Sequence, residues 1–293
     1  MEQALTATRE WTTIDTPRMT PPPLRLPALI LGVALAGPIT PGAAAAQSGV
    51  APREAPDTCS RIWTGQERAF EDALTTGVVT RVEPVPVGVT KPQRATLAPG
   101  GPAARFAWKP LPPQRRGGYR ESYKAEIAAY RLDRLLDLGM VPPVVERTMD
   151  GKVGAAILWI EHATGWDMHA PPRGPEPEWS RQVSRMKLFD QLIANIDRNQ
   201  GNLLYDADWH LFLIDHSRAF TTRTSFDGIA APNTIDRRLW ARIDALTDAD
   251  LSQALGAWLT ADERRAILTR RDHMRTAVAK LVKARGAARV FLE

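Results

Sequence analysis

Two carboxylates and one amide stand where predicted elements end, in positions that suit cation binding. Asp197 precedes Asn202 by five residues in a polar loop, and Asp215 directly follows the apolar run 211–214. If that run pairs with 203–205 as a hairpin, Asn202 and Asp215 lie side by side at one end of it. Magnesium takes one or two carboxylates together with phosphate oxygens. The sequence therefore predicts a metal site at Asn202 and Asp215, with Asp197 facing the nucleophile.

Phosphoryl transfer is the chemistry that such a site would serve. It needs a carboxylate that orients the attacking hydroxyl, oxygen ligands for the metal ions, and a lysine on the nucleotide phosphates. The catalytic aspartate and the metal-binding asparagine of protein kinases have the spacing of Asp197 and Asn202. Lys109 closes the predicted strand 105–109 and suits the lysine role, and Glu126 on the next predicted helix is placed to hold it.

The elements that carry Lys109 and Glu126 are predicted from two periodicities. The valine-rich segment 78–89, with 94–98 and 105–109, indicates an antiparallel meander. Apolar residues recur at helical spacing over 121–138, which places Glu126 beside the apolar stripe and Gly139 at a left-handed cap.

The remaining segments complete an α+β order. They predict a short helix over 61–74, a solvated loop at 115–118, a buried strand over 153–161, a central helix over 181–196, and a helical remainder over 234–285. Strands with one inserted helix followed by a mostly helical part indicate two segregated lobes. We expect an N-lobe over 61–162 that binds a nucleotide, and a C-lobe over 163–293 that holds the catalytic loop, the metal site and a helical tail.

Two stretches of the chain resemble known kinases. EIAAYRLDRLL at 126–136, followed by VPPVV at 141–145, is similar to the corresponding helix and exit of the atypical secretory-pathway kinases typified by the Golgi casein kinase. Asp197-Arg198 with Asn202, and Ile214-Asp215, resemble the Asp-Arg-His-x-x-Asn and Ile-Asp-Phe-Gly motifs of phosphatidylinositol kinases. The resemblance covers roughly 78–220.

Carried over by position, the resemblance implies a two-lobed protein-kinase-like fold with ATP and Mg²⁺ or Mn²⁺ as cofactors. It implies that Lys109 contacts the ATP phosphates and that Glu126 supports Lys109 or the metal. It also implies that Asp197 is the catalytic aspartate and that Asn202 and Asp215 bind metal.

Other positions are assigned by the resemblance or depart from it. Trp159 and Glu161 stand where such a fold connects its lobes and where backbone groups would hold the adenine, although Trp159 could equally be ordinary core. Asn199 replaces the histidine of the lipid kinases, and His216-Ser217 replaces Phe-Gly. The chain has no Gly-x-Gly-x-x-Gly, and 87–90 is the candidate for the phosphate-covering turn.

Composition narrows the class of protein. With 293 residues, 44% hydrophobic and 24% charged, the chain has the make-up of a folded globular protein. Its net charge of +5 comes from scattered basic residues, which argues against duplex nucleic acid as a partner. The single cysteine, Cys59, cannot form an internal disulfide, and no Cys/His cluster indicates structural zinc.

The first 46 residues have the pattern of an export signal. Arg25 precedes the apolar stretch 26–39, and small residues at 43–46 suit cleavage after Ala46. Because Met19 stands just before the basic residue, 1–18 would come from a start codon assigned too far upstream. The apolar stretch is too short for a stable membrane span. We expect a periplasmic or extracellular protein with a linker at 47–60; the alternative is a cytoplasmic protein with an Ala/Pro-rich tail.

These patterns together predict an ATP-dependent kinase that phosphorylates a hydroxyl, with serine or threonine of a protein as the first candidate acceptor. Three alternatives stay open. The chain could be a catalytically silent nucleotide-binding pseudokinase, a lipid or small-molecule kinase, or a nucleotidyl transferase on the same fold.

Overall fold

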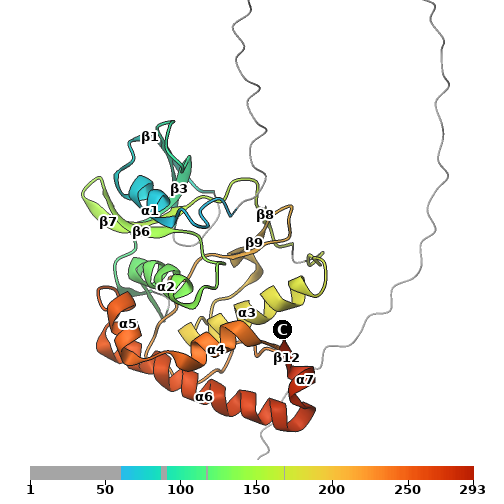
Figure 1. Cartoon of the computed structure of the whole chain (residues 1–293). Coiled ribbons are helices and arrows are strands. Elements are labelled where there is room, and N and C mark those ends of the chain that lie inside the picture. Colours follow the sequence, from blue (N-terminus) through green and yellow to red (C-terminus); the bar gives the residue numbers. More distant parts are fainter. Residues whose placement is uncertain (1–60, 87–90, 117, 168) are drawn as a thin grey trace, which may run out of the picture. The chain divides into compact units, whose positions relative to one another are not determined.

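The computed structural model describes residues 61–86, 91–116, 118–167 and 169–293 (Figure 1). The predicted signal peptide, the linker and the candidate phosphate-covering turn 87–90 lie outside these residues. The helices are α1 Glu67–Thr76, α2 Tyr123–Leu136, α3 Glu178–Ile193, α4 Arg237–Ala245, α5 Asp248–Leu255, α6 Ala261–Arg285 and α7 Ala287–Val290. The strands are β1 Val79–Pro84, β2 Gln93–Leu97, β3 Arg105–Lys109, β4 Gln114–Arg116, β5 Tyr119–Glu121, β6 Val144–Met149, β7 Lys152–Leu158, β8 Thr164–Gly165, β9 Leu203–Tyr205, β10 Leu211–Leu213, β11 Ile235–Asp236 and β12 Phe291–Leu292.

The principal sheet has five antiparallel strands in the order β1-β2-β3-β7-β6. The predicted meander is confirmed in β1, β2 and β3, and the predicted buried strand corresponds to β7. Lys109, the last residue of β3, pairs with Ala155 in the middle of β7. The sequence did not predict β6, which joins β7 at the sheet edge.

Alternating side chains give the sheet two apolar faces. Leu158 of β7 belongs to the hydrophobic cluster that contains Phe70 of α1. Its neighbour Ile157 belongs to the cluster that contains Ile127 of α2. The sheet therefore lies between α1 and α2 (Figure 1).

Helix α2 begins and ends at polar caps. The Ser122 hydroxyl accepts a hydrogen bond from the Lys124 amide at 3.1 Å. At the other end the cap residue is Asp137, two residues before Gly139, with φ 52°; Gly139 has the predicted left-handed conformation too, with φ 68°. The Asp133 carboxylate accepts the amides of Gly139 and Met140. Those hydrogen bonds turn the chain back toward the helix, so the helix is capped two residues before Gly139.

The second part of the chain is mostly helical, as predicted. The hairpin of β9 and β10 is confirmed, with Leu203 opposite Leu213. The predicted helical remainder is three main helices, because Thr247 and Thr260 each form a capping box and begin α5 and α6. The structure confirms the α+β class. The lobe boundary at 162–163 remains a prediction.

One further hairpin occurs where the sequence suggested a solvated loop. Strands β4 and β5 pair antiparallel, with Gln114 opposite Glu121. Glu121 is fully buried directly before the cap of α2. Among the described residues, no helix has the length and apolar character needed to cross a membrane.

Candidate functional site

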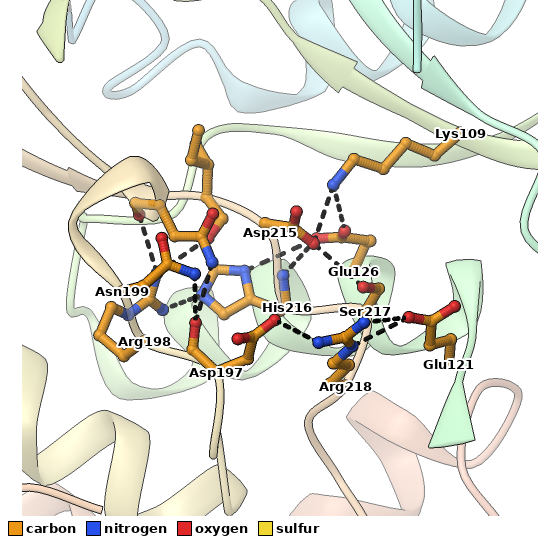
Figure 2. Close-up of polar contacts among 12 residues, drawn as sticks. Lys109, Glu121, Glu126, Asp197, Arg198, Asn199, Asp215, His216, Ser217 and Arg218 are labelled. Carbon is orange, nitrogen blue, oxygen red and sulfur yellow. Dashed lines mark hydrogen bonds and ion pairs between the residues drawn. The ribbon is translucent and has the colours of Figure 1, made fainter. Parts of the chain in front are cut away.

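A buried ion triad joins the sheet, helix α2 and the segment after β10. Lys109 Nζ lies 2.8 Å from Glu126 Oε1 and 3.1 Å from Asp215 Oδ1. The side chains of Lys109 and Glu126 are 8% and 1% exposed, so each charge needs its partner to be tolerated away from water. Figure 2 shows the ammonium of Lys109 directed at both carboxylates. The structure thus brings together three residues far apart in the sequence.

Lys109 and Glu126 both keep their charges in the triad. Burial alone would lower the pKa of Lys109, but the carboxylates of Glu126 and Asp215 outweigh it and raise that pKa above its ordinary value. Burial alone would raise the pKa of Glu126, but the charge of Lys109 and the contact with His216 hold it well below its ordinary value. A cation and a carboxylate are therefore both present at neutral pH.

Glycine at position 154 permits the sheet geometry that places Lys109. A Cβ atom on Gly154 of β7 would lie 2.6 Å from the Lys109 carbonyl oxygen and 2.7 Å from the Pro110 Cα. Both contacts are with backbone, which cannot swing aside. The end of β3 approaches β7 closely only because residue 154 has no side chain.

Asp215 has an uncommon backbone conformation, with φ 57°. Its Oδ1 accepts the Ser217 hydroxyl at 3.0 Å in addition to contacting Lys109. The next residue, His216, donates its amide to Glu126 Oε2 at 2.8 Å. The turn after β10 is thus tied to α2 by a backbone hydrogen bond and to β3 by an ion pair.

Arg198 organises the loop between α3 and β9. Its side chain is 9% exposed and forms an ion pair with Asp190 at 3.0 Å. It also donates to the carbonyl oxygens of Asn202 and Ile214, each at 2.8 Å. Arg198 thus pairs with a carboxylate and with backbone carbonyl groups. The guanidinium joins the segments that carry Asn202 and Asp215.

His216 is a neutral member of the same network. Its Nε2 lies 2.9 Å from a guanidinium nitrogen of Arg198, and because a guanidinium only donates, Nε2 is the acceptor. Nδ1 then carries the proton and lies 3.7 Å from Glu126 Oε2. Burial, assisted by the charge of Arg198, lowers the pKa of His216. His216 is therefore buried between Glu126 and Arg198 and contacts both.

Asn202 and Asp215 have the donor chemistry of a divalent-cation site. Asn202 is buried, and its Nδ2 donates to the Asp197 carbonyl oxygen at 2.9 Å, which leaves Oδ1 to accept. Within the described part of the chain, no hydrogen-bond donor contacts Oδ2 of Asp215. Hard divalent cations prefer such amide and carboxylate oxygens. The residues present fit Mg²⁺ or Mn²⁺.

Asp197 lies at the open side of the site. Its side chain is 37% exposed, and Oδ2 accepts a hydrogen bond from Arg218 at 3.0 Å. Arg218 also donates to buried Glu121 at 2.7 and 2.9 Å (Figure 2). The sequence analysis missed both Arg218 and Glu121. The position of Arg218 three residues after Asp215 is the one signal that could have pointed to it.

Trp159 and Glu161 follow the end of β7. The contacts that the structure describes for them are with arginines. The Trp159 amide donates to the Arg105 carbonyl oxygen at 3.1 Å, and Arg94 lies over its ring at 5.4 Å. Glu161 forms a bidentate ion pair with Arg105. The backbone amide of Trp159 is thus engaged in the sheet. A role of these residues in holding adenine remains a prediction.

Comparisons with known proteins identify the fold. Neither a family model nor a curated protein sequence matches the chain. Solved structures do match. The Golgi casein kinase with Mn and ADP bound aligns with a TM-score of 0.60 at 15% identity, covering 78% of this chain and 79% of that chain. Hydra Fam20 with sugar aligns with a TM-score of 0.60 at 18% identity, covering 78% and 93%. The predicted resemblance is confirmed at the level of fold, and this chain has the two-lobed fold of the Golgi casein kinase type of atypical kinase.

Proposed function

We propose that this protein is a metal-dependent kinase that transfers the γ-phosphoryl group of ATP to a hydroxyl, with serine or threonine of a protein as acceptor. The observation that carries the proposal is the contact of Lys109 with both Glu126 and Asp215. The Mn and ADP of the structural neighbour support the same choice of cofactors.

Each residue has a task in the proposed reaction. Lys109 would neutralise the nucleotide phosphates, and Asn202 and Asp215 would hold Mg²⁺ or Mn²⁺, which supplies charge neutralisation when bound. Asp197 would orient the acceptor hydroxyl and take its proton. The hydroxyl oxygen then forms a bond to the γ-phosphorus while the bond from that phosphorus to the bridging oxygen breaks, and ADP leaves. Trp159 and Glu161 would border the adenine.

One observation favours a second candidate, a nucleotide-binding pseudokinase. The Asp197 carboxylate is already engaged by Arg218 at 3.0 Å. If that ion pair persists with substrate bound, it occupies Oδ2 and makes the carboxylate a weaker base, which disfavours proton transfer from a hydroxyl. Binding of ATP without turnover would be the signature of this alternative.

Transfer of radiolabelled phosphate from ATP tests the proposal. With casein as the probe acceptor, we expect label on serine or threonine in the wild type and a loss of about a thousandfold or more in Asp197→Asn. Nucleotide binding should be retained in that variant. Asp208→Asn, which changes an exposed carboxylate in the β9–β10 turn, is the matched control.

The outcomes separate the candidates. Turnover by Asp197→Asn at the wild-type rate contradicts the assignment of Asp197. ATP binding with neither phosphate transfer nor hydrolysis in the wild type supports the pseudokinase. Label found on lipid but not on protein would identify a lipid kinase, and a product mass increased by a nucleotide would identify nucleotidyl transfer.

A further inference from the structure

A cavity of about 340 Å³ lies apart from the candidate site. Its wall comes from the turn before α1, the C-terminal half of α2, α3 and α4, and it includes none of the residues proposed for nucleotide or metal binding. The volume lies within the range of small-molecule sites, which begins at roughly 300 Å³. Five arginines line it: Arg61, Arg134, Arg185, Arg238 and Arg242.

The charge of the wall is positive. The five guanidiniums share it with three carboxylates, those of Glu67, Asp133 and Asp137. Arg185 forms its ion pair, at 3.1 Å, with Asp236, which is not part of the wall. With Arg185 neutralised by Asp236, four guanidiniums face three carboxylates, and this excess of one positive charge attracts anions.

The carboxylates of the wall are already engaged. Asp133 accepts the backbone amides of Gly139, Met140 and Val141 at 2.8 to 3.1 Å. Asp137 forms an exposed ion pair with Arg242 at 2.8 Å. Asp133 thus binds backbone amides after α2, and Asp137 forms a surface ion pair. Neither carboxylate prevents an anion from entering the cavity.

Two arginines of the wall keep unused donors. Neither Arg61 nor Arg238 forms a salt bridge with any residue that the structure describes, and Arg238 is exposed. The terminal nitrogen of Arg61 lies close to Gly139, where a Cβ atom would overlap it. A planar guanidinium with free N–H groups is suited to bidentate binding of phosphate.

We propose that this cavity binds a phosphate-bearing anion through Arg61 and Arg238. Arg61 precedes α1 and Arg238 lies in α4, so a bound anion joins two elements that flank α2. Glu126 lies on the same helix, seven residues before Asp133, or about 10 Å along the axis. A bound anion would therefore bridge the turn before α1 and α4 beside the C-terminal end of the helix that carries Glu126.

Calorimetric titration of the full-length protein with inorganic phosphate and with pyrophosphate, at constant ionic strength, tests the proposal. We expect saturable binding of at least one of them. Arg61→Ala and Arg238→Ala should each weaken it by about tenfold or more. Arg289→Ala, an exposed arginine of α7, is the matched control and should leave it unchanged.

Two further variants make the result decisive. Asp215→Asn should still bind phosphate in the cavity, so a failure of the nucleotide site does not affect this test. If Arg61→Ala does not fold, the exposed Arg238→Ala carries the comparison. Absence of saturable binding in the wild type, or undiminished binding in Arg238→Ala, overturns the proposal.

Discussion

Lys109 is the residue on which the site converges. Its ammonium is buried and contacts the carboxylates of Glu126 and Asp215, which belong to a helix and to the turn after β10. A buried charge that loses its partner is costly, because water cannot replace the lost contact. The triad therefore contributes to stability as well as to the proposed phosphate binding.

Replacing Glu126 tests this double role. We expect Glu126→Gln to lower the free energy of unfolding by about 3 kcal/mol, since it leaves Lys109 buried with one charged partner fewer. The pKa of Glu126 is lowered on folding, so its contribution is present above the ordinary carboxyl value and is lost only as the pH falls through the lowered value. The pKa of Lys109 is raised, so its contribution persists up to and beyond its ordinary value.

Urea denaturation at pH 5, 7 and 9 measures the effect. The difference between wild type and Glu126→Gln should be the same at all three values. Glu178→Gln, which removes a 52% exposed carboxylate from a surface pair, should change stability by less than about 0.5 kcal/mol. A difference for Glu126→Gln as small as that of the control would contradict the account of the triad.

Arg218 provides a second test among single residues. It contacts fully buried Glu121 and the 37% exposed carboxylate of Asp197. We expect a double-mutant cycle of Arg218→Met with Glu121→Gln to give a coupling energy above about 1 kcal/mol. The cycle with Asp197→Asn should give less, because water screens that pair. The reverse order would show that Arg218 is anchored on Asp197, as the pseudokinase alternative requires.

The sequence indicated some of these residues and not others for a physical reason. Lys109 and Asp215 stand at strand ends, and Glu126 lies on one face of a strongly periodic helix. Local sequence patterns are therefore enough to predict these three residues as candidates for the site. Glu121 and Arg218 meet across 97 residues of sequence. Their contact depends on the β4–β5 hairpin, and that hairpin has no apolar periodicity from which it could be predicted.

At the scale of elements, the pairing of β3 with β7 sets the position of Lys109. We expect Gly154→Ala to destabilise the protein by about 1–3 kcal/mol, because its Cβ would overlap the backbone at Lys109 and Pro110. Nucleotide affinity should fall with it. Gly165→Ala in β8 is the matched control, since a Cβ there meets nothing within 4 Å.

Thermal denaturation and nucleotide titration of the two variants check this expectation. A Gly154→Ala protein as stable as Gly165→Ala, with unchanged affinity, would show that the close approach of β3 and β7 is not required.

The accuracy of the predicted elements follows the strength of their patterns. Regularly spaced apolar residues predict α2, an apolar segment with several buried faces predicts α3, and two short apolar runs joined by a polar turn predict the β9–β10 hairpin. Strand β6 was missed because it lies at the sheet edge, where only its first two residues are buried. The remainder 234–285 was correctly predicted to be helical, but its breaks at Thr247 and Thr260 depend on capping hydrogen bonds that apolar periodicity does not register.

At the scale of the whole molecule, β10 links the two hydrophobic clusters. Phe212 belongs to the cluster of the sheet and α1, whereas Leu211 and Leu213 belong to the cluster of α2 and the helical part. Asp215 follows this strand by two residues. The proposed metal ligand Asp215 therefore follows a strand that packs in both clusters.

Export of the protein is predicted from residues 1–46 alone. We expect amino-terminal sequencing of protein recovered outside the cytosol to begin at Gln47, because cleavage should follow Ala46. Fractionation that finds uncleaved protein in the cytosol would support the alternative localisation.

Nucleotide binding by this site should depend on a divalent metal ion. Calorimetric titration with ADP should show binding in the presence of Mn²⁺ that disappears when the metal is removed with EDTA, and Asp215→Asn should weaken it by about tenfold or more. ADP binding that persists unchanged without metal, or that is equal in wild type and Asp215→Asn, would contradict a site in which Lys109, Asn202 and Asp215 hold a nucleotide through a shared cation.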